Sequence, residues 1–196
     1  MKAKFNLMTD STCDFSIQDI ERSGLTFLPF TYMEAGKPDG GLSGLDDLFQ
    51  SMSARDFYER IRWGATPKTS QPSQLVYEEA FRKAAELDVP TVLMTISSGI
   101  SGGYNGACTA LDRVQEELGR ELPIYIVDTL LASTSFYLLL EEGVRQRDRG
   151  VTAEEFVRWA EDARYHVWTI FMVDNLDTLH RGGRIPKSVA LVSSAL

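Results

Sequence analysis

The feature that most constrains the fold is a regular alternation of short apolar runs with longer segments of helical periodicity. The strand candidates are residues 5–9, 25–31, 91–96 and 124–127. The helical segments between and after them, residues 75–87, 104–118 and 135–149, have apolar positions spaced three and four apart, and the last two stop at Gly119 and Gly150. Such a rhythm predicts an α/β fold, with a parallel sheet flanked by helices.

Three loops that follow predicted strands begin with small polar or acidic residues. They are residues 10–12 (Asp-Ser-Thr), 97–99 (Ser-Ser-Gly) and 128–129 (Asp-Thr). In parallel sheets, loops at the carboxyl ends of the strands line the ligand crevice. We therefore expect the functional site at this edge of the sheet.

The pattern changes after residue 150. Thr152 and Glu155 form the ends of a capping box for a helix that runs to about Arg164, and residues 167–173 read as a strand. The chain then stops at Leu196 within an amphipathic helical pattern. We expect an N-terminal α/β domain over residues 1–150 and the incomplete beginning of a second α/β domain over 151–196, in a chain that reads as truncated.

Composition excludes several classes of protein. The chain has 43% apolar residues and a formal net charge of -8, which fits a folded core and argues against nucleic-acid binding. The apolar stretches are too short for a signal peptide or a membrane span. Two cysteines at unrelated positions predict buried free thiols in a reducing cytoplasm, and two histidines leave no closed zinc site. We expect no metal and no cofactor.

The segment ISSGISGGYNG joins a predicted buried strand to a helix. Its backbone N–H groups and the helix dipole favour an anion, and Ser97, Ser98 and Ser101 add hydroxyl donors. A local interpretation is also open, in which Ser101 caps its own helix and the other two serines are ordinary loop residues.

The same segment contains a G-x-S-x-G pattern centred on Ser101. Asp128 and His180 follow in the chain order of a Ser-Asp-His triad, so a serine esterase is the alternative function. The short interval between Ser101 and Asp128 weakens that alternative, as does the absence of an HGGG-type segment before the elbow. It also leaves Ser97 and Ser98 without a role.

A second hydroxyl cluster lies in TSQPS, residues 69–73. Pro72 suits the first turn of the following helix, Ser73 suits its N-cap, and the proline holds Gln71 in an extended conformation. Thr69 and Ser70 are then free either to face a cleft or to form local turn hydrogen bonds.

Two arginines, Arg181 and Arg184, flank the pair Gly182-Gly183. They are either solvated side chains around a turn or contacts for an anionic ligand or a partner protein.

Taken together, the segments MTDSTCDF, TSQPS, ISSGISGGYNGA, IVDT and LHRGGRI resemble, in order and across the whole chain, the DegV family of bacterial fatty-acid-binding proteins. The resemblance implies a two-domain α/β fold that encloses a long-chain fatty acid. It implies a lipid-binding acyl carrier, not an enzyme, that holds the carboxylate for a separate fatty acid kinase. The implied partners are the fatty acid and that kinase, without nucleic acid, and peripheral membrane contact is compatible with this role.

The resemblance also implies site residues. In the family, one hydroxyl of the TSQ motif and one serine of the SS-x-x-SG motif hold the carboxylate, which carries over to Thr69 and Ser98. Ser70 and Ser97 are neighbours able to substitute for them, and Arg181 and Arg184 are candidates for the surface that meets the kinase. Where the family commonly has threonine after SG, this chain has Gly103.

Overall fold

The computed structural model describes residues 3–34, 36–37, 41–87, 89–173 and 176–186. A four-stranded parallel sheet forms the centre of the molecule, as the alternating sequence pattern predicts. Its strands are β1 (Asn6–Asp10), β2 (Thr26–Leu28), β6 (Thr91–Thr95) and β7 (Ile124–Asp128), in the order β2-β1-β6-β7. All three strand pairs are parallel. The carboxyl ends of β1, β6 and β7 therefore lie at one edge, where the loops with polar residues begin.

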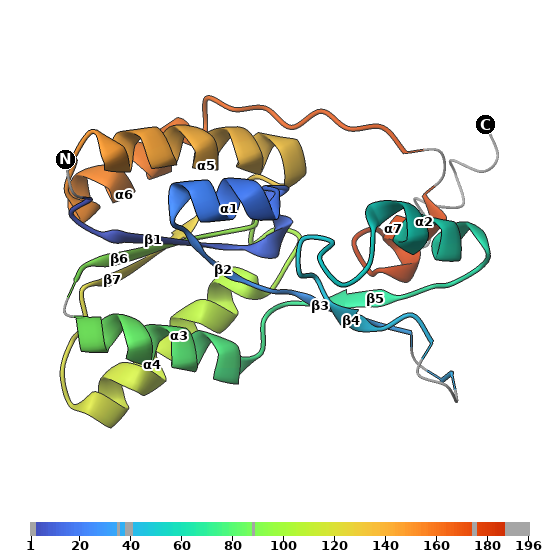
Figure 1. The fold of residues 1–196 in the computed structure, drawn as a ribbon, viewed down its shortest axis with the longest axis horizontal. Coiled ribbons are helices and arrows are strands. Elements are labelled where there is room, and N and C mark those ends of the chain that lie inside the picture. The colour runs from blue at the N-terminus through green and yellow to red at the C-terminus, as the bar shows by residue number, and fades with distance from the viewer. Residues whose placement is uncertain (1–2, 35, 38–40, 88, 174–175, 187–196) are drawn as a thin grey trace.

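Helices cover both faces of this sheet (Figure 1). On one face lie α1 (Ile17–Ser23), α5 (Ser133–Asp148) and α6 (Ala153–Ala163); on the other lie α3 (Gln74–Leu87) and α4 (Gly103–Leu118). Among the described helices, none combines the length and the apolar character needed to cross a membrane.

The strands divide their side chains between two cores. In β6, Val92 and Met94 pack with α5 and α6, whereas Leu93 packs with α3 and α4. All five residues of β6 are buried. Because both faces are covered, the strand needs a continuous apolar run rather than an alternating one, and its sequence has that character.

The helix ends follow local sequence signals. Thr152 and Glu155 form a complete capping box at the start of α6, as the sequence predicts. Ser53 caps α2 (Ala54–Arg62), and Gly119 ends α4 in the left-handed conformation with φ 64°. One detail differs, because α3 begins at Gln74 and Pro72 therefore precedes its N-cap instead of lying in its first turn.

A small lobe projects from the main sheet (Figure 1). It contains an antiparallel sheet in which β3 (Thr31–Met33) lies between β4 (Gly44–Leu45) and β5 (Lys68–Ser70). Helices α2 and α7 (Asp177–Arg181) lie beside it. The lobe connects to the main sheet at both ends: β2 leads into β3, and β5 leads into α3.

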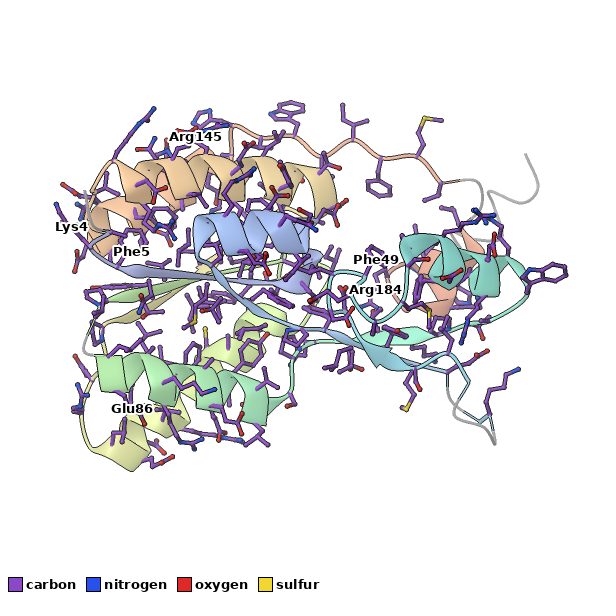
Figure 2. All side chains as sticks on the ribbon, viewed as in Figure 1. Lys4, Phe5, Phe49, Glu86, Arg145 and Arg184 are labelled. Carbon is purple, nitrogen blue, oxygen red and sulfur yellow. The ribbon has the colours of Figure 1, made fainter. Side chains whose placement is uncertain are left out.

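The predicted strand over residues 167–173 is wrong. These residues are described and form no strand, and Trp168, Ile170 and Met172 have 83%, 88% and 95% of their surface exposed. The segment runs on in extended form beyond the end of α6 (Figure 2). A strand requires a hydrogen-bonded neighbour, and β-type composition alone cannot supply one.

The division of the chain at residue 150 stays a prediction. Helix α6 lies beyond that boundary, yet its Phe156 and Ala160 are fully buried in the same core as Phe5 and Phe136. The ring centroids of Phe5 and Phe156 are 5.0 Å apart. Helix α6 therefore packs against the elements that precede residue 150.

Candidate functional site

Two acidic residues fasten the loop that follows β6. Asp10, at the end of β1, accepts hydrogen bonds from Ile96 N at 2.8 Å and Thr12 N at 3.0 Å. Asp128, at the end of β7, accepts from Ser98 N at 3.0 Å. The loop that begins at Ser97 is thus fixed from both neighbouring strands through its backbone.

Burial shapes the chemistry of Asp10. The residue is fully buried, and burial raises the pKa of its carboxyl from 3.8 to about 6, against the opposite effect of its hydrogen bonds. Asp10 also caps the short 3-10 helix at Ser11–Cys13, whereas Ser16 caps α1. Asp10 is therefore a structural support of the site, and among the described residues no group of three or more His, Cys, Asp or Glu is placed to hold a metal ion.

The three serines after β6 differ in their surroundings. Ser97 Oγ accepts from Gly99 N and Ser101 Oγ accepts from Gly103 N, both at 3.2 Å. Ser98 is exposed, and its hydroxyl has no hydrogen-bond partner among the described residues. Helix α4 starts directly after this loop, and its N-cap residue, Gly102, makes no side-chain cap. The Ser98 hydroxyl therefore lies near a helix N-terminus whose first N–H group, that of Gly103, is already bonded to Ser101 Oγ.

The other hydroxyl cluster lies on an edge strand. Thr69 and Ser70 of β5 pair with Tyr32 and Thr31 of β3, and both are exposed. Within the described ranges, neither hydroxyl has a hydrogen-bond partner. The local turn that the sequence left open is therefore not formed by these two side chains. Ser73 accepts from Val76 N at 3.3 Å and caps α3.

Gln71 brings the two clusters together. A Cβ atom added at Gly102 would lie 2.5 Å from Gln71 Oε1, and one added at Gly106 would lie 2.5 Å from Gln71 Nε2. The carboxamide directly after Thr69 and Ser70 therefore rests on the first turn of α4, next to the serine loop. Sequence analysis missed this contact, although two glycines four residues apart on one helix face are a signal of close approach.

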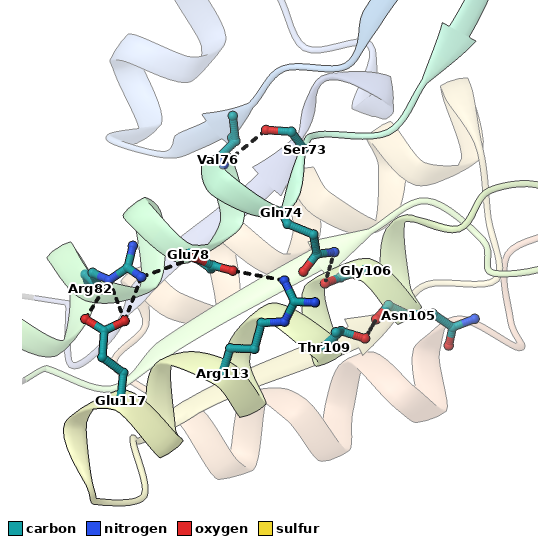
Figure 3. A network of polar contacts seen from close by, with 10 residues as sticks. All are labelled: Ser73, Gln74, Val76, Glu78, Arg82, Asn105, Gly106, Thr109, Arg113 and Glu117. Atoms are coloured by element: carbon teal, nitrogen blue, oxygen red, sulfur yellow. Dashed lines mark hydrogen bonds and ion pairs between the residues drawn. The ribbon is translucent and has the colours of Figure 1, made fainter.

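Polar contacts between α3 and α4 maintain this arrangement (Figure 3). Gln74 Nε2 donates to Gly106 O at 3.0 Å, close to the N-termini of both helices. Further along, Glu78 binds Arg82 of its own helix and Arg113 of α4, and Arg82 binds Glu117 at 2.7 Å. The two helices therefore begin at the same end of the sheet, beside the serine loop.

An open pocket of about 370 Å³ lies between the serine loop and the loop after α7. Its walls are Ser98, Gly99, Ile100, Ser101, Gly102, Asn105, Gly182, Gly183 and Arg184. Arg184 (labelled in Figure 2) donates from Nε to Ile100 O at 3.3 Å. The pocket thus combines a free hydroxyl, a helix N-terminus and a guanidinium group, all of which favour an anion.

The predicted site residues differ in their relation to this pocket. Ser98 and Arg184 line it, whereas Ser97, Thr69 and Ser70 do not. Thr69 and Ser70 approach it through Gln71, which contacts the lining residue Gly102. Arg181 is exposed and donates to Thr178 Oγ1 of its own helix at 3.3 Å.

The geometry required for the esterase alternative is not present among the described residues. Ser101 Oγ accepts from a backbone N–H, and Asp128 is bonded to the backbone N–H groups of Ser98 and Leu130. The ring of His180 contacts Ile185 O at 3.3 Å. No hydrogen bond links these three side chains, so a nucleophile, a base and an orienting acid are not assembled.

Comparisons with known proteins agree with this architecture. A family model described as "Uncharacterised protein, DegV family" matches residues 4–196. The DegV domain-containing protein YteA of Lactococcus lactis is 38% identical over 190 residues, which cover 97% of this chain and 64% of that protein. A fatty acid-binding protein of Thermotoga maritima is 32% identical over 198 residues, covering 98% and 65%.

A solved structure shares the fold. The crystal structure of a stearic acid-binding protein from Eubacterium ventriosum superposes with a TM-score of 0.76 at 28% identity, covering 94% of this chain and 61% of that one. This chain therefore spans less than two thirds of the length of the relatives it matches.

Proposed function

Because this chain belongs to the DegV family, we propose that it binds a long-chain fatty acid and presents the carboxylate to a separate fatty acid kinase for acyl-phosphate formation. The observation that carries the proposal is that the hydroxyls of Thr69, Ser70 and Ser98 have no hydrogen-bond partner in the described part of the chain and lie on two segments that meet beside the N-terminus of α4. Relatives of the chain are a fatty acid-binding protein and a stearic acid-binding protein.

The chemistry of the two segments suits a carboxylate. Thr69 and Ser98 donate hydrogen bonds to its oxygens, and Ser70 and Ser97 are the neighbouring hydroxyls able to substitute. The N–H groups at the start of α4 and the guanidinium of Arg184 add favourable charge. Hydroxyl donors leave the carboxylate ionised, so one of its oxygens remains a nucleophile for the phosphoryl group that the kinase supplies.

The acyl chain supplies most of the affinity. Each buried methylene contributes about 0.8 kcal/mol, so a long chain contributes on the order of 10 kcal/mol before the costs of binding. The polar groups at the pocket then select the headgroup. This division assigns binding and presentation to the present chain and the chemical step to the kinase.

Two further points belong to the proposal. Cys13 and Cys108 are unpaired, which fits a reducing, cytoplasmic location, although Cys108 is only half-buried rather than buried as the sequence predicts. The surface around Arg181 and Arg184 is the proposed contact for the kinase, and residues 151–196 are proposed to begin a second domain.

The test is the double substitution Thr69→Ala with Ser98→Ala. Each lost hydrogen bond to a charged acceptor costs about 1.5 kcal/mol, so we expect fatty-acid binding to weaken roughly a hundredfold in isothermal titration. The matched control is Ser51→Ala with Thr134→Ala, two exposed hydroxyls elsewhere, which should leave binding unchanged. Equal affinity of the double variant and the parent would refute the assigned carboxylate contacts.

A further inference from the structure

Gln71 lies so close to α4 that a side chain at either of two glycines would have to displace the end of the Gln71 side chain. Cβ atoms essentially never approach a heavy atom within 3.0 Å, yet at Gly102 and Gly106 they would lie 2.5 Å from the two ends of the Gln71 carboxamide. Positions 102 and 106 are one helical turn apart and share a face of α4. These two glycines together form a seat for one side chain.

The seated carboxamide has unused hydrogen-bonding capacity. Gln71 is half-buried, and its side chain makes no hydrogen bond within the part of the chain that the structure describes. The nearby backbone oxygen of Gly106 is already taken by Gln74 Nε2 at 3.0 Å. The two glycines therefore leave room for the Gln71 side chain, while its polar atoms remain available.

The position of Gln71 in the chain connects its contact with α4 to the proposed headgroup site. It follows Ser70 directly in the chain, and it contacts Gly102, which lines the same pocket as Ser98. The Gln71 carboxamide is thus a side-chain contact between the segment that carries Thr69 and Ser70 and the start of α4 beside the Ser98 loop.

We propose that Gln71 is the positioning residue of the headgroup site, seated on Gly102 and Gly106 so that the hydroxyls of β5 and of the serine loop converge on one carboxylate. The inference rests on the proposed function. It predicts that Gln71 governs the preference for a carboxylate over an uncharged headgroup, and that its contribution is distinct from burial of the acyl chain.

A stability experiment that needs no ligand tests the seat. Gly106→Ala should raise the urea midpoint of unfolding less in the parent than in a Gln71→Ala background, because in the parent the new methyl group must displace the Gln71 carboxamide. In both backgrounds alanine is a better helix former than glycine. The control is Gly143→Ala, whose Cβ would lie 3.1 Å from Phe156 in the distant core and should change the midpoint equally in both backgrounds. A Gly106→Ala effect of the same size in both backgrounds would overturn the proposed seat.

A ligand experiment tests the role in the headgroup site. Stearic acid and stearyl alcohol have the same chain length and differ only in the headgroup. Their affinities are measured for the parent and for the variants Gln71→Ala and Gln71→Glu, which separates effects on headgroup binding from effects on binding of the acyl chain. Gln71→Glu preserves the size of the side chain and adds a negative charge near the bound carboxylate. We expect acid binding to weaken at least tenfold and alcohol binding to change less than twofold.

Failure of the positioning role and failure of the proposed function would give different results in these two experiments. Parallel changes for acid and alcohol would show that Gln71 only packs, and would overturn the positioning role. A parent protein that binds neither ligand would overturn the proposed function and with it the headgroup role of Gln71. The difference between the two Gly106→Ala effects would in that case still establish the contact itself.

Discussion

At the scale of single residues, Asp10 anchors the loop that carries Ser97 and Ser98, and its buried carboxyl gains or loses a proton at a different pH in the folded and unfolded protein. Its three hydrogen-bond donors are the backbone N–H groups of Thr12 and Ile96 and the hydroxyl of Thr12. Burial nevertheless dominates and raises its pKa from 3.8 to about 6. Between these two values, the folded protein binds a proton that the unfolded chain releases.

Asp10 should therefore make stability depend on pH in a defined direction. Its contribution is fully present below about pH 4 and is lost as the pH rises to about 6, a change of roughly 3 kcal/mol for a pKa shift of this size. We expect the free energy of unfolding of the parent, relative to Asp10→Asn, to fall by about that amount between pH 4 and pH 7 in urea titrations. Glu121→Gln, at an exposed position, is the control for removing one negative charge. A parent-minus-variant difference that stays constant with pH would contradict the prediction.

At the scale of elements, helix α4 begins with a glycine that its surroundings do not require. A Cβ atom at Gly103 would meet Tyr77 Oη at 3.4 Å and Ser101 Oγ at 3.5 Å, which are ordinary contact distances. The hydroxyl of Tyr77 is buried and has no hydrogen-bond partner among the described residues. This position therefore tolerates a side chain, whereas one at Gly102 or Gly106 would have to displace the Gln71 carboxamide.

Substitutions at the start of α4 should reflect that difference. We expect Gly103→Ala to raise the free energy of unfolding by about 0.5 kcal/mol through reduced backbone entropy, and Gly103→Ser to raise it by about 1 kcal/mol if its hydroxyl reaches that of Tyr77. Gly119→Ala, at φ 64°, should instead lower it, because alanine is strained in the left-handed region. Thermal unfolding of the three variants would measure the order. Destabilisation by Gly103→Ala would show that the glycine is needed there.

The helices and strands also show which parts of the fold could be predicted from the sequence. The helix boundaries at the Thr152 capping box and at Gly119 were predictable because local hydrogen bonds determine them. Residues 167–173 were mispredicted because strand formation depends on a partner that no local pattern specifies. At the site, the sequence identified the hydroxyl clusters, but the seat of Gln71 depends on how β5 meets α4, which is a tertiary contact.

At the scale of the whole molecule, one core includes α6, and the segment after it contacts that core through Val167 only at its start. Phe156 and Phe136 are fully buried together, whereas Phe171 is 70% exposed. The stabilisation of the described unit should therefore fall off within this segment, before Phe171. This distinction can be measured with one type of substitution.

Truncation of phenylalanine to alanine should separate the two regions. We expect Phe156→Ala and Phe136→Ala each to lower the free energy of unfolding by about 3 to 5 kcal/mol, because each leaves a cavity in the core. Phe171→Ala should change it by less than about 0.5 kcal/mol. Denaturant unfolding at one pH gives all three values. A small effect of Phe156→Ala would place α6 outside the cooperative unit, and a large effect of Phe171→Ala would mean that the exposed segment packs in solution.

The way the serine loop is fastened has a consequence for the history of such a site. Asp10 and Asp128 hold that loop through backbone N–H groups, and backbone groups are the same whichever side chains the loop carries. Under the proposed function, substitutions at Ser98 would change the headgroup contact without displacing the loop itself. The backbone of the loop and its ligand preference can then change at different rates in evolution. Descendants of one ancestral protein could acquire new ligands while Asp10 and Asp128 stay unchanged.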